Sequence, residues 1–143
     1  MKLKIKITGV NVHDLLFKGF LIQMAFDAMV MKFHAIKETI DGEMVFDRKI
    51  AADQQVLVIL LDDRERQIEY FKRLLESRDY NTDKEQLKYF GDLMKKTGSR
   101  IQITKIEYEP YDEEVPELLV TMPFYNCRLI DTVCDKKQYQ FRK

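Results

Sequence analysis

A segment that alternates like a β-strand runs directly into a strongly apolar helix near the start of the chain, and this junction limits the folds open to the sequence. From Lys2 to Thr8, lysines alternate with apolar residues, the period of two that places one strand face against a core and the other in water. Gly9 is expected to end the strand, and Asn11 or Asp14 to cap the following helix. The helix is expected over residues 15 to 33, and its broad apolar face predicts that it lies flat on a sheet.

Four methionines belong to this helix and the segments after it, namely Met24, Met29, Met31 and Met44. Flexible thioether side chains either form adaptable binding surfaces or fill irregular gaps in a core. Core filling is the role expected here.

A run of consecutive apolar residues, VLVILL at positions 56 to 61, predicts a central, buried strand. Asp41-Gly42 is a turn signal upstream of it. Two segments could pair antiparallel with the central strand, residues 34 to 40 or residues 44 to 52, and the sequence leaves both open.

Two helical segments follow the central strand. The first is expected to begin at Asp62-Asp63, whose charges favour the positive end of a helix dipole, and to end near Arg78. The second is expected to begin at Thr82, which forms a capping-box pattern with Glu85, and to end at Gly98.

The last part of the chain contains three further strand-like segments. Residues 100 to 109 alternate and predict a fourth strand, and Leu118 to Met122 and Cys127 to Val133 predict two more. Aromatic residues are frequent in this region, and we expect them to pack an extension over the sheet or to contact a second copy of the chain.

The order strand, helix, hairpin, helix pair, strand predicts an α+β fold of the ferredoxin-like, split βαβ kind, with an extended second helical region and extra C-terminal strands. A chain of 143 residues fits one domain. We expect a single domain over residues 1–143, with a core at about 2–109 and an extension at about 110–143.

The overall charge argues against two classes of partner. The 24 basic and 24 acidic residues cancel, which removes the bulk attraction that nucleic-acid and membrane-surface binders use. No apolar run reaches the roughly 20 residues of a membrane span, and the alternating start, MKLKIKITG, does not resemble a signal peptide. A cytoplasmic protein without membrane or nucleic-acid partners is expected.

The two cysteines, Cys127 and Cys134, are expected to be free thiols. Two thiols with no histidine nearby are too few for a structural zinc site or for a secreted disulfide framework. No metal and no cofactor are predicted.

The loop between the first strand and the helix is the candidate site. The first N–H groups of a helix lack intrahelical partners and attract anions, so we expect Gly9, Val10, Asn11, Val12 and Lys18 to bind phosphate or a similar small anion. His13 and Asp14 beside Lys18 could form a catalytic group, with the carboxylate orienting the imidazole. The alternative is that Asp14 is a helix cap and His13 a loop residue.

The segment ITGVNVHDLLFK, followed by an alanine-containing helix, resembles the acylphosphatase family, in particular a divergent branch with a Val-His-Asp element in this loop. The resemblance implies a ferredoxin-like fold and an acyl-phosphate ligand. It also implies that Lys18 occupies the position of the arginine that holds the phosphate. If Asp41-Gly42 is matched to the family's Asp-Gly turn, Glu38 falls at the position of the asparagine that positions the attacking water.

A lysine lacks the planar fork of arginine, and a glutamate at position 38 would repel phosphate. The resemblance therefore implies an acylphosphatase-like domain that is catalytically weak or inactive and binds a small anion or a partner. Two alternatives are an active acyl-phosphate hydrolase that uses Lys18, and a nucleic-acid-binding or regulatory ferredoxin-like module.

Overall fold

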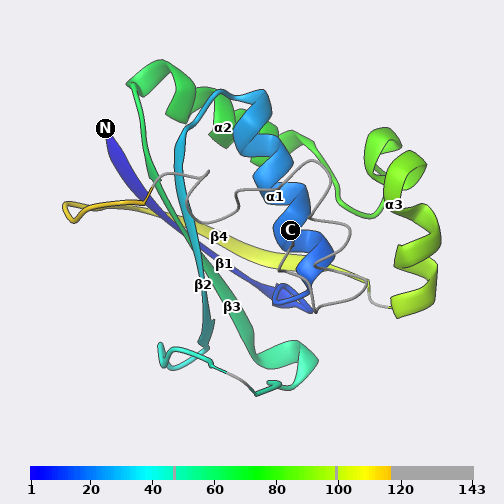
Figure 1. Ribbon diagram of the computed structural model, residues 1–143. Helices are drawn as coiled ribbons and strands as arrows, with labels where there is room; N and C mark the ends of the chain where they lie inside the picture. The colour runs from blue at the N-terminus through cyan, green and yellow to red at the C-terminus, as the bar shows by residue number, and fades with distance from the viewer. Residues whose placement is uncertain (47, 99, 117–143) are drawn as a thin grey trace, which may run out of the picture.

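The computed structural model describes residues 1–46, 48–98 and 100–116 and shows an antiparallel sheet with helices packed on one of its faces (Figure 1). Its elements are, in order, β1 Lys2–Val10, α1 Leu15–Asp27, β2 Lys32–Thr39, the short 3₁₀ helix η1 Ala52–Gln54, β3 Gln55–Asp62, α2 Glu65–Ser77, α3 Lys84–Thr97 and β4 Gln102–Pro110.

The four strands lie in the order β2-β3-β1-β4, and every neighbouring pair is antiparallel. This order and the α+β element sequence are compatible with the expected ferredoxin-like fold. The open question of the hairpin is resolved in favour of the earlier segment, because β2 pairs with β3 from Lys32 opposite Asp62 to Thr39 opposite Gln55. The later segment contributes only an isolated bridge between Met44 and Glu38.

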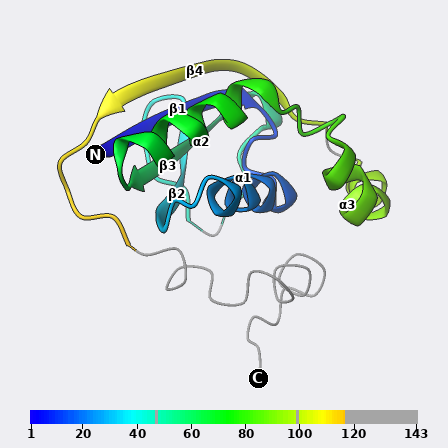
Figure 2. The same ribbon diagram turned by 90° about the horizontal axis from the view of Figure 1, so that it is seen from above.

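The main core lies between the sheet and helices α1 and α2 (Figure 2). Alternate residues of β1 and β3 face it, as the period of two requires, and the broad apolar face of α1 covers them. Its largest fully buried side chains include Ile5, Ile7, Leu57, Ile59, Phe17, Leu21, Met24, Ile68 and Phe71.

The sequence suggested that Gly9 ends the first strand. This was wrong, because β1 continues to Val10. The pairing of β1 with β4 shifts register between Thr8 and Gly9. A Cβ atom built on Gly9 would lie 2.2 Å from the Gln102 carbonyl oxygen. The glycine is therefore required for the close approach of β4 at a bulge, a role that glycine often has within strands.

Helix α1 ends at Asp27, six residues before the expected end at residue 33. Met29 adopts a left-handed conformation with φ of 60°, and the N–H of Val30 donates to the Ala25 carbonyl at 2.8 Å. This is a Schellman ending. It turns the chain into β2, and it leaves Met29 and Met31 exposed, as Met44 also is, so only Met24 fills the core as expected.

Helix α2 begins later than the sequence suggested. Asp62 is the last residue of β3, and the Asp63 carboxylate accepts a hydrogen bond from the Arg64 N–H at 2.7 Å. The acidic pair therefore forms the turn before the helix, which begins at Glu65.

Helix α3 is capped by Asp83 and not by Thr82. The Asp83 carboxylate accepts from the Gln86 N–H at 3.0 Å, and Gly98 ends the helix in the expected left-handed conformation. Both views show α3 set to one side of the sheet and its two covering helices (Figure 2).

A smaller apolar cluster lies on the sheet face opposite the helices. Val56, Val58 and Leu60 of β3 form it together with Val115, which is 1% exposed, and Tyr111 packs against it. The chain after β4 thus crosses this face, and the Phe33 N–H donates to the Pro116 carbonyl at 3.1 Å. The described start of the expected extension is part of the packed structure, whereas the two predicted strands at 118–122 and 127–133 and the two cysteines lie outside the described residues.

Candidate functional site

The loop between β1 and α1 is a tight turn that uses several of its own amide groups. Asn11 has a left-handed φ of 61°. Its N–H donates to the Ala52 carbonyl at 2.9 Å, and the Asp14 N–H donates to the Asn11 carbonyl at 3.0 Å. Of the residues expected to bind an anion through backbone N–H groups, Gly9 and Val10 lie within β1, and Asn11 is already bonded. Val12 is fully buried.

Asp14 is the N-cap of α1. One of its carboxylate oxygens accepts from the Leu16 N–H at 2.8 Å, the bond that satisfies an otherwise unpaired donor at a helix start. No hydrogen bond of the described residues joins its side chain to that of His13. The expected alternative, a cap, is therefore what Asp14 does in the structure.

His13 links the loop to the two neighbouring strands β2 and β3. Its Nε2 lies 3.1 Å from the Glu38 carbonyl oxygen and 2.8 Å from the Val56 carbonyl oxygen. Both partners are acceptors, so Nε2 carries a proton. Burial lowers the pKa of His13, and the nearby Lys37 ammonium lowers it further, which favours the neutral ring.

The Gln55 side chain is hydrogen-bonded both to the β1–α1 loop and to the segment before β3. Its side-chain oxygen accepts from the His13 N–H at 2.9 Å, and its side-chain nitrogen donates to the Ile50 carbonyl at 2.9 Å. Gln55 is buried, with 8% of its surface exposed. This one residue therefore fixes the β1–α1 loop relative to the segment that precedes β3.

Lys18 lies one turn into α1 and is partly buried. Its ammonium forms no ion pair or hydrogen bond with the described residues. Burial lowers the pKa of Lys18, with a further contribution from the Lys37 ammonium. Burial lowers the pKa of His34, and the charge on Lys18 lowers it further. The Lys37 charge therefore acts on His13 and Lys18, and the Lys18 charge acts on His34.

A cavity of about 370 Å³ opens beside the loop. Its volume is at the lower end of the range for small-molecule pockets, roughly 300–1,000 Å³. The cavity is lined by residues of the loop, of β2 and of the segment before β3, namely Asn11, His13, Asp14, Lys37, Arg48, Lys49, Ile50, Ala52 and Gln55. Lys18 does not line it.

Three cations of this cavity were missed by sequence reasoning, which considered only the loop and Lys18. Lys37 comes from β2, and Arg48 and Lys49 come from the segment between β2 and β3. Of these three cations, only Arg48 has an acidic partner among the described residues. That partner is Glu43, at a long 3.9 Å between the charged groups. The adjacent pair Arg48-Lys49 was visible in the sequence, but its approach to the loop depends on the pairing of β2 with β3.

Glu38 does not line the cavity, so the expected repulsion of an anion by its carboxylate does not arise there. Its backbone carbonyl holds His13, and it pairs with Val56, whose side chain packs on the sheet face opposite the helices. Because side chains opposite each other on paired strands share a face, the Glu38 carboxylate belongs to that opposite face.

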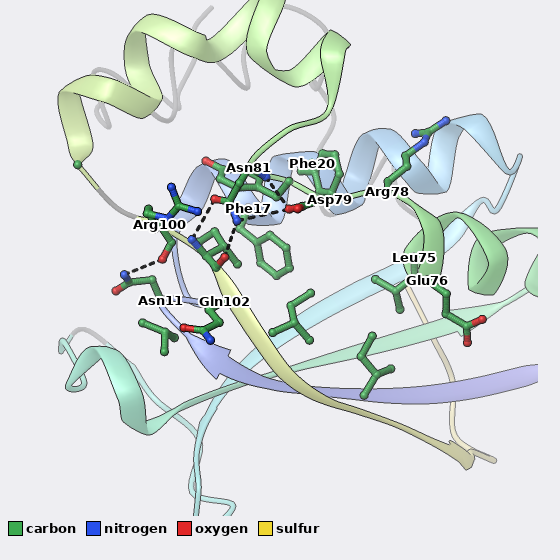
Figure 3. Close-up of a pocket in the computed structure, with 16 residues that line it drawn as sticks. Asn11, Phe17, Phe20, Leu75, Glu76, Arg78, Asp79, Asn81, Arg100 and Gln102 are labelled. Atoms are coloured by element: carbon green, nitrogen blue, oxygen red, sulfur yellow. Dashed lines mark hydrogen bonds between the residues drawn. The ribbon is translucent and has the colours of Figure 1, made fainter.

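A larger cavity of about 940 Å³ lies on the helix side, between α1, the α2–α3 connection and the start of β4 (Figure 3). Several of its polar groups are hydrogen-bonded or ion-paired. Asn81 donates to the Ile101 carbonyl at 2.6 Å, Asn11 donates to the Arg100 carbonyl at 3.0 Å, and Arg78 pairs with Asp27 at 2.7 Å. The smaller cavity is the stronger candidate site, because its cations have few acidic partners.

Residues 1–46, 48–98 and 100–116 contain no group of three or more side chains suited to holding a metal ion. In the same ranges no helix is long and apolar enough to cross a membrane. Comparisons with protein-family models, with curated proteins and with solved structures found no match to this chain.

Proposed function

We propose that the cavity beside the β1–α1 loop binds a small anion such as phosphate, in an acylphosphatase-like domain with little or no hydrolase activity. The observation that supports this proposal is the excess of positive charge at one place. Lys37, Arg48 and Lys49 line the cavity with His13 and with one carboxylate, that of Asp14. The protein has zero formal net charge, so attraction of an anion to this cavity would come from the local excess and not from the overall charge.

The partly buried ammonium of Lys18, which has no acidic partner among the described residues, supports the same conclusion. Removing an ammonium from water without an acidic partner is unfavourable, and the lowered pKa of Lys18 reflects this cost. A bound anion would supply the missing negative charge. Binding should therefore raise the pKa of Lys18 and also that of His13.

We propose weak catalysis because polar groups of His13 and Asp14 already form hydrogen bonds within the protein. Nε2 of His13 bonds two carbonyl groups, and the Asp14 carboxylate caps α1. Lys18 cannot grip two phosphate oxygens with a planar fork as an arginine does. The resemblance to acylphosphatases therefore supports an anion-binding site better than it supports hydrolysis of an acyl phosphate.

The nucleic-acid alternative gains no support from the exposed sheet face. Lys4 lies opposite Glu109, and Lys6 lies opposite Glu107. These cross-strand pairs balance the lysines of β1, whereas single-stranded nucleic-acid sites combine a positive groove with aromatic platforms.

Titration with inorganic phosphate and with sulfate, followed through backbone amide shifts, tests the proposal. We expect shifts at His13, Ile50 and Ala52 with a dissociation constant in the millimolar range, which corresponds to about 4 kcal/mol. Lys37→Ala should weaken binding severalfold, whereas Lys96→Ala should not, although it removes the same charge at the end of α3. Absence of shifts around the cavity would exclude the site.

A further inference from the structure

The His13 ring uses one of its two nitrogens to hold the fold and leaves the other without a partner. Nε2 donates to the Glu38 and Val56 carbonyl oxygens, at 3.1 and 2.8 Å. Nδ1 forms no hydrogen bond with the described residues, and it is not among their buried side-chain atoms that lack a partner. Because His13 lines the cavity and is only partly buried, Nδ1 is open to solvent and to a ligand.

The proton on Nε2 leaves Nδ1 with the lone pair of a neutral imidazole. Burial lowers the pKa of His13, the hydrogen bond to the Val56 carbonyl opposes this effect, and the Lys37 charge lowers the pKa further. A neutral imidazole nitrogen is a nucleophile. The two carbonyl groups hold the ring in one orientation, and they stabilise positive charge on the ring once Nδ1 has formed a bond.

The charges around this nitrogen suit a phosphoryl group. Lys37, Arg48 and Lys49 line the same cavity, and cations stabilise a phosphoryl group during transfer. Arg48 shares its charge with Glu43 only at 3.9 Å, between exposed side chains. Asp14 is the one acidic side chain among the described residues of the lining, and its carboxylate caps the positive end of α1. The described lining therefore carries more positive than negative charge.

We propose that His13 accepts a phosphoryl group at Nδ1 from an acyl phosphate bound in the cavity. The bond between phosphorus and the acyl oxygen breaks, and its electron pair leaves with the carboxylate. The Nδ1 lone pair forms the new bond to phosphorus, and Nε2 keeps its proton, so the ring becomes positively charged and no proton is transferred. This inference rests on the proposed function, because the donor must first bind as an anion. It is compatible with slow hydrolysis, since release of phosphate from His13 needs an activated water in a second step.

Acetyl phosphate is the probe, and peptide mass spectrometry and phosphorus NMR locate the phosphoryl group. The sequence contains two histidines, so His34, which is also partly buried, is an internal control for the reactivity of an imidazole. We expect a phosphoramidate at His13 that exceeds any at His34 by about tenfold or more. It should be labile in acid and stable in alkali, and stability in alkali excludes an acyl phosphate on Asp14.

Substitutions and a competitor then assign the site. His13→Gln should abolish the label, and His34→Gln should leave it unchanged. Lys37→Ala should slow labelling of His13 about tenfold, whereas Lys96→Ala, which removes the same charge at the end of α3, should not. Excess sulfate, which binds without reacting, should also slow labelling of His13.

The possible results are distinct. Phosphate binding at the cavity without a label on His13 overturns the inference and leaves the proposed function in place. Equal labelling of the two histidines, or labelling that neither Lys37→Ala nor sulfate slows, identifies a non-specific reaction and also overturns it. Absence of both binding and label means that the inference and the proposed function both fail. If His13→Gln does not fold, the mapping on the parent chain and the Lys37→Ala rate decide.

Discussion

The side chain of Asn81 holds the backbone of Ile101 in both directions. Its Nδ2 donates to the Ile101 carbonyl at 2.6 Å, and its Oδ1 accepts from the Ile101 N–H at 3.3 Å. Asn81 thereby substitutes for a neighbouring strand at the point where the chain returns from α3 to β4. The two contacts tie the connection before α3 to the start of β4.

Asn81→Ala should therefore lower the free energy of unfolding by about 1–3 kcal/mol, because it leaves partly buried backbone groups of Ile101 without partners. Chemical denaturation measures the loss, and hydrogen exchange at the Ile101 amide locates it. Gln102→Ala, a nearby change at an exposed residue, is the control and should be almost neutral. Equal stability of the two variants would show that the Asn81 contacts are not required.

Two glycines should respond in opposite directions to the same substitution. Gly9→Ala places a Cβ atom 2.2 Å from the Gln102 carbonyl oxygen, and the displacement of β4 should cost more than about 2 kcal/mol. Gly91 lies within α3 with nothing within 4 Å of its added Cβ, so Gly91→Ala should stabilise the helix by about 0.5–1 kcal/mol. Thermal and urea unfolding measure both, and a harmless Gly9→Ala would contradict the close approach of β4.

Stability should decrease as the pH falls through 6.5. Burial lowers the pKa values of His13 and His34 in the folded protein below the 6.5 of an unperturbed histidine, so the unfolded state binds more protons in the window just below that value. The free energy of unfolding therefore rises with pH through this window and levels off above about 6.5. Urea midpoints at pH 7.5 and 5.5 measure the difference.

The chain contains two histidines, which gives this pH dependence an internal control. His13→Gln and His34→Gln should each remove part of the difference between the two midpoints, and the double variant should retain only the part due to carboxylates. A double variant with the full pH dependence of the parent would assign the effect to other groups.

Hydrolysis of acyl phosphates should be slow. Loss of one preorganised donor in a transition-state site typically costs a hundredfold to a thousandfold in rate. Under the proposed acylphosphatase-like function, Lys18 offers a point charge where acylphosphatases have an arginine. We expect turnover of benzoyl phosphate below the ordinary range of about 1–1,000 per second. Phosphate release from benzoyl and acetyl phosphate measures it.

Two substitutions of Lys18 show how the measured turnover rate should be interpreted. Lys18→Arg should increase turnover if a decayed acylphosphatase site is present, and Lys96→Ala should leave it unchanged. Turnover in the ordinary range that disappears in Lys18→Ala would instead identify an active hydrolase that depends on lysine.

The local patterns of the sequence predicted the elements well and their ends less well. Alternation over Lys2 to Thr8 and the apolar run at 56 to 61 predicted β1 and β3. The end of α1 at Asp27 was missed, because Met29 takes a left-handed conformation that glycine usually supplies. Gly9 was misinterpreted because its role is set by Gln102, which is distant in the sequence.

Only part of the candidate site could be predicted from the sequence, for the same reason. The loop residues His13 and Asp14 lie together in the sequence, whereas Lys37, Arg48 and Lys49 reach the loop only after β2 has paired with β3. Two candidate segments for that pairing were open, so the position of these cations could not be inferred. Local spacing shows which residues are neighbours along a strand or helix, and it does not show which strands meet.

The central position of β1 has a consequence for synthesis of the chain. It is made before the other three described strands, yet its last described neighbour is β4, and the Thr104 hydroxyl that donates to the Thr8 carbonyl is 96 positions away. At translation rates of about 5–20 residues per second, β1 waits roughly 5–20 seconds with one edge unpaired. Exposed edges invite pairing with other nascent chains, and charged side chains, lysine above all, discourage it. The lysines at positions 2, 4 and 6 should therefore discourage such pairing during the interval before β4 emerges.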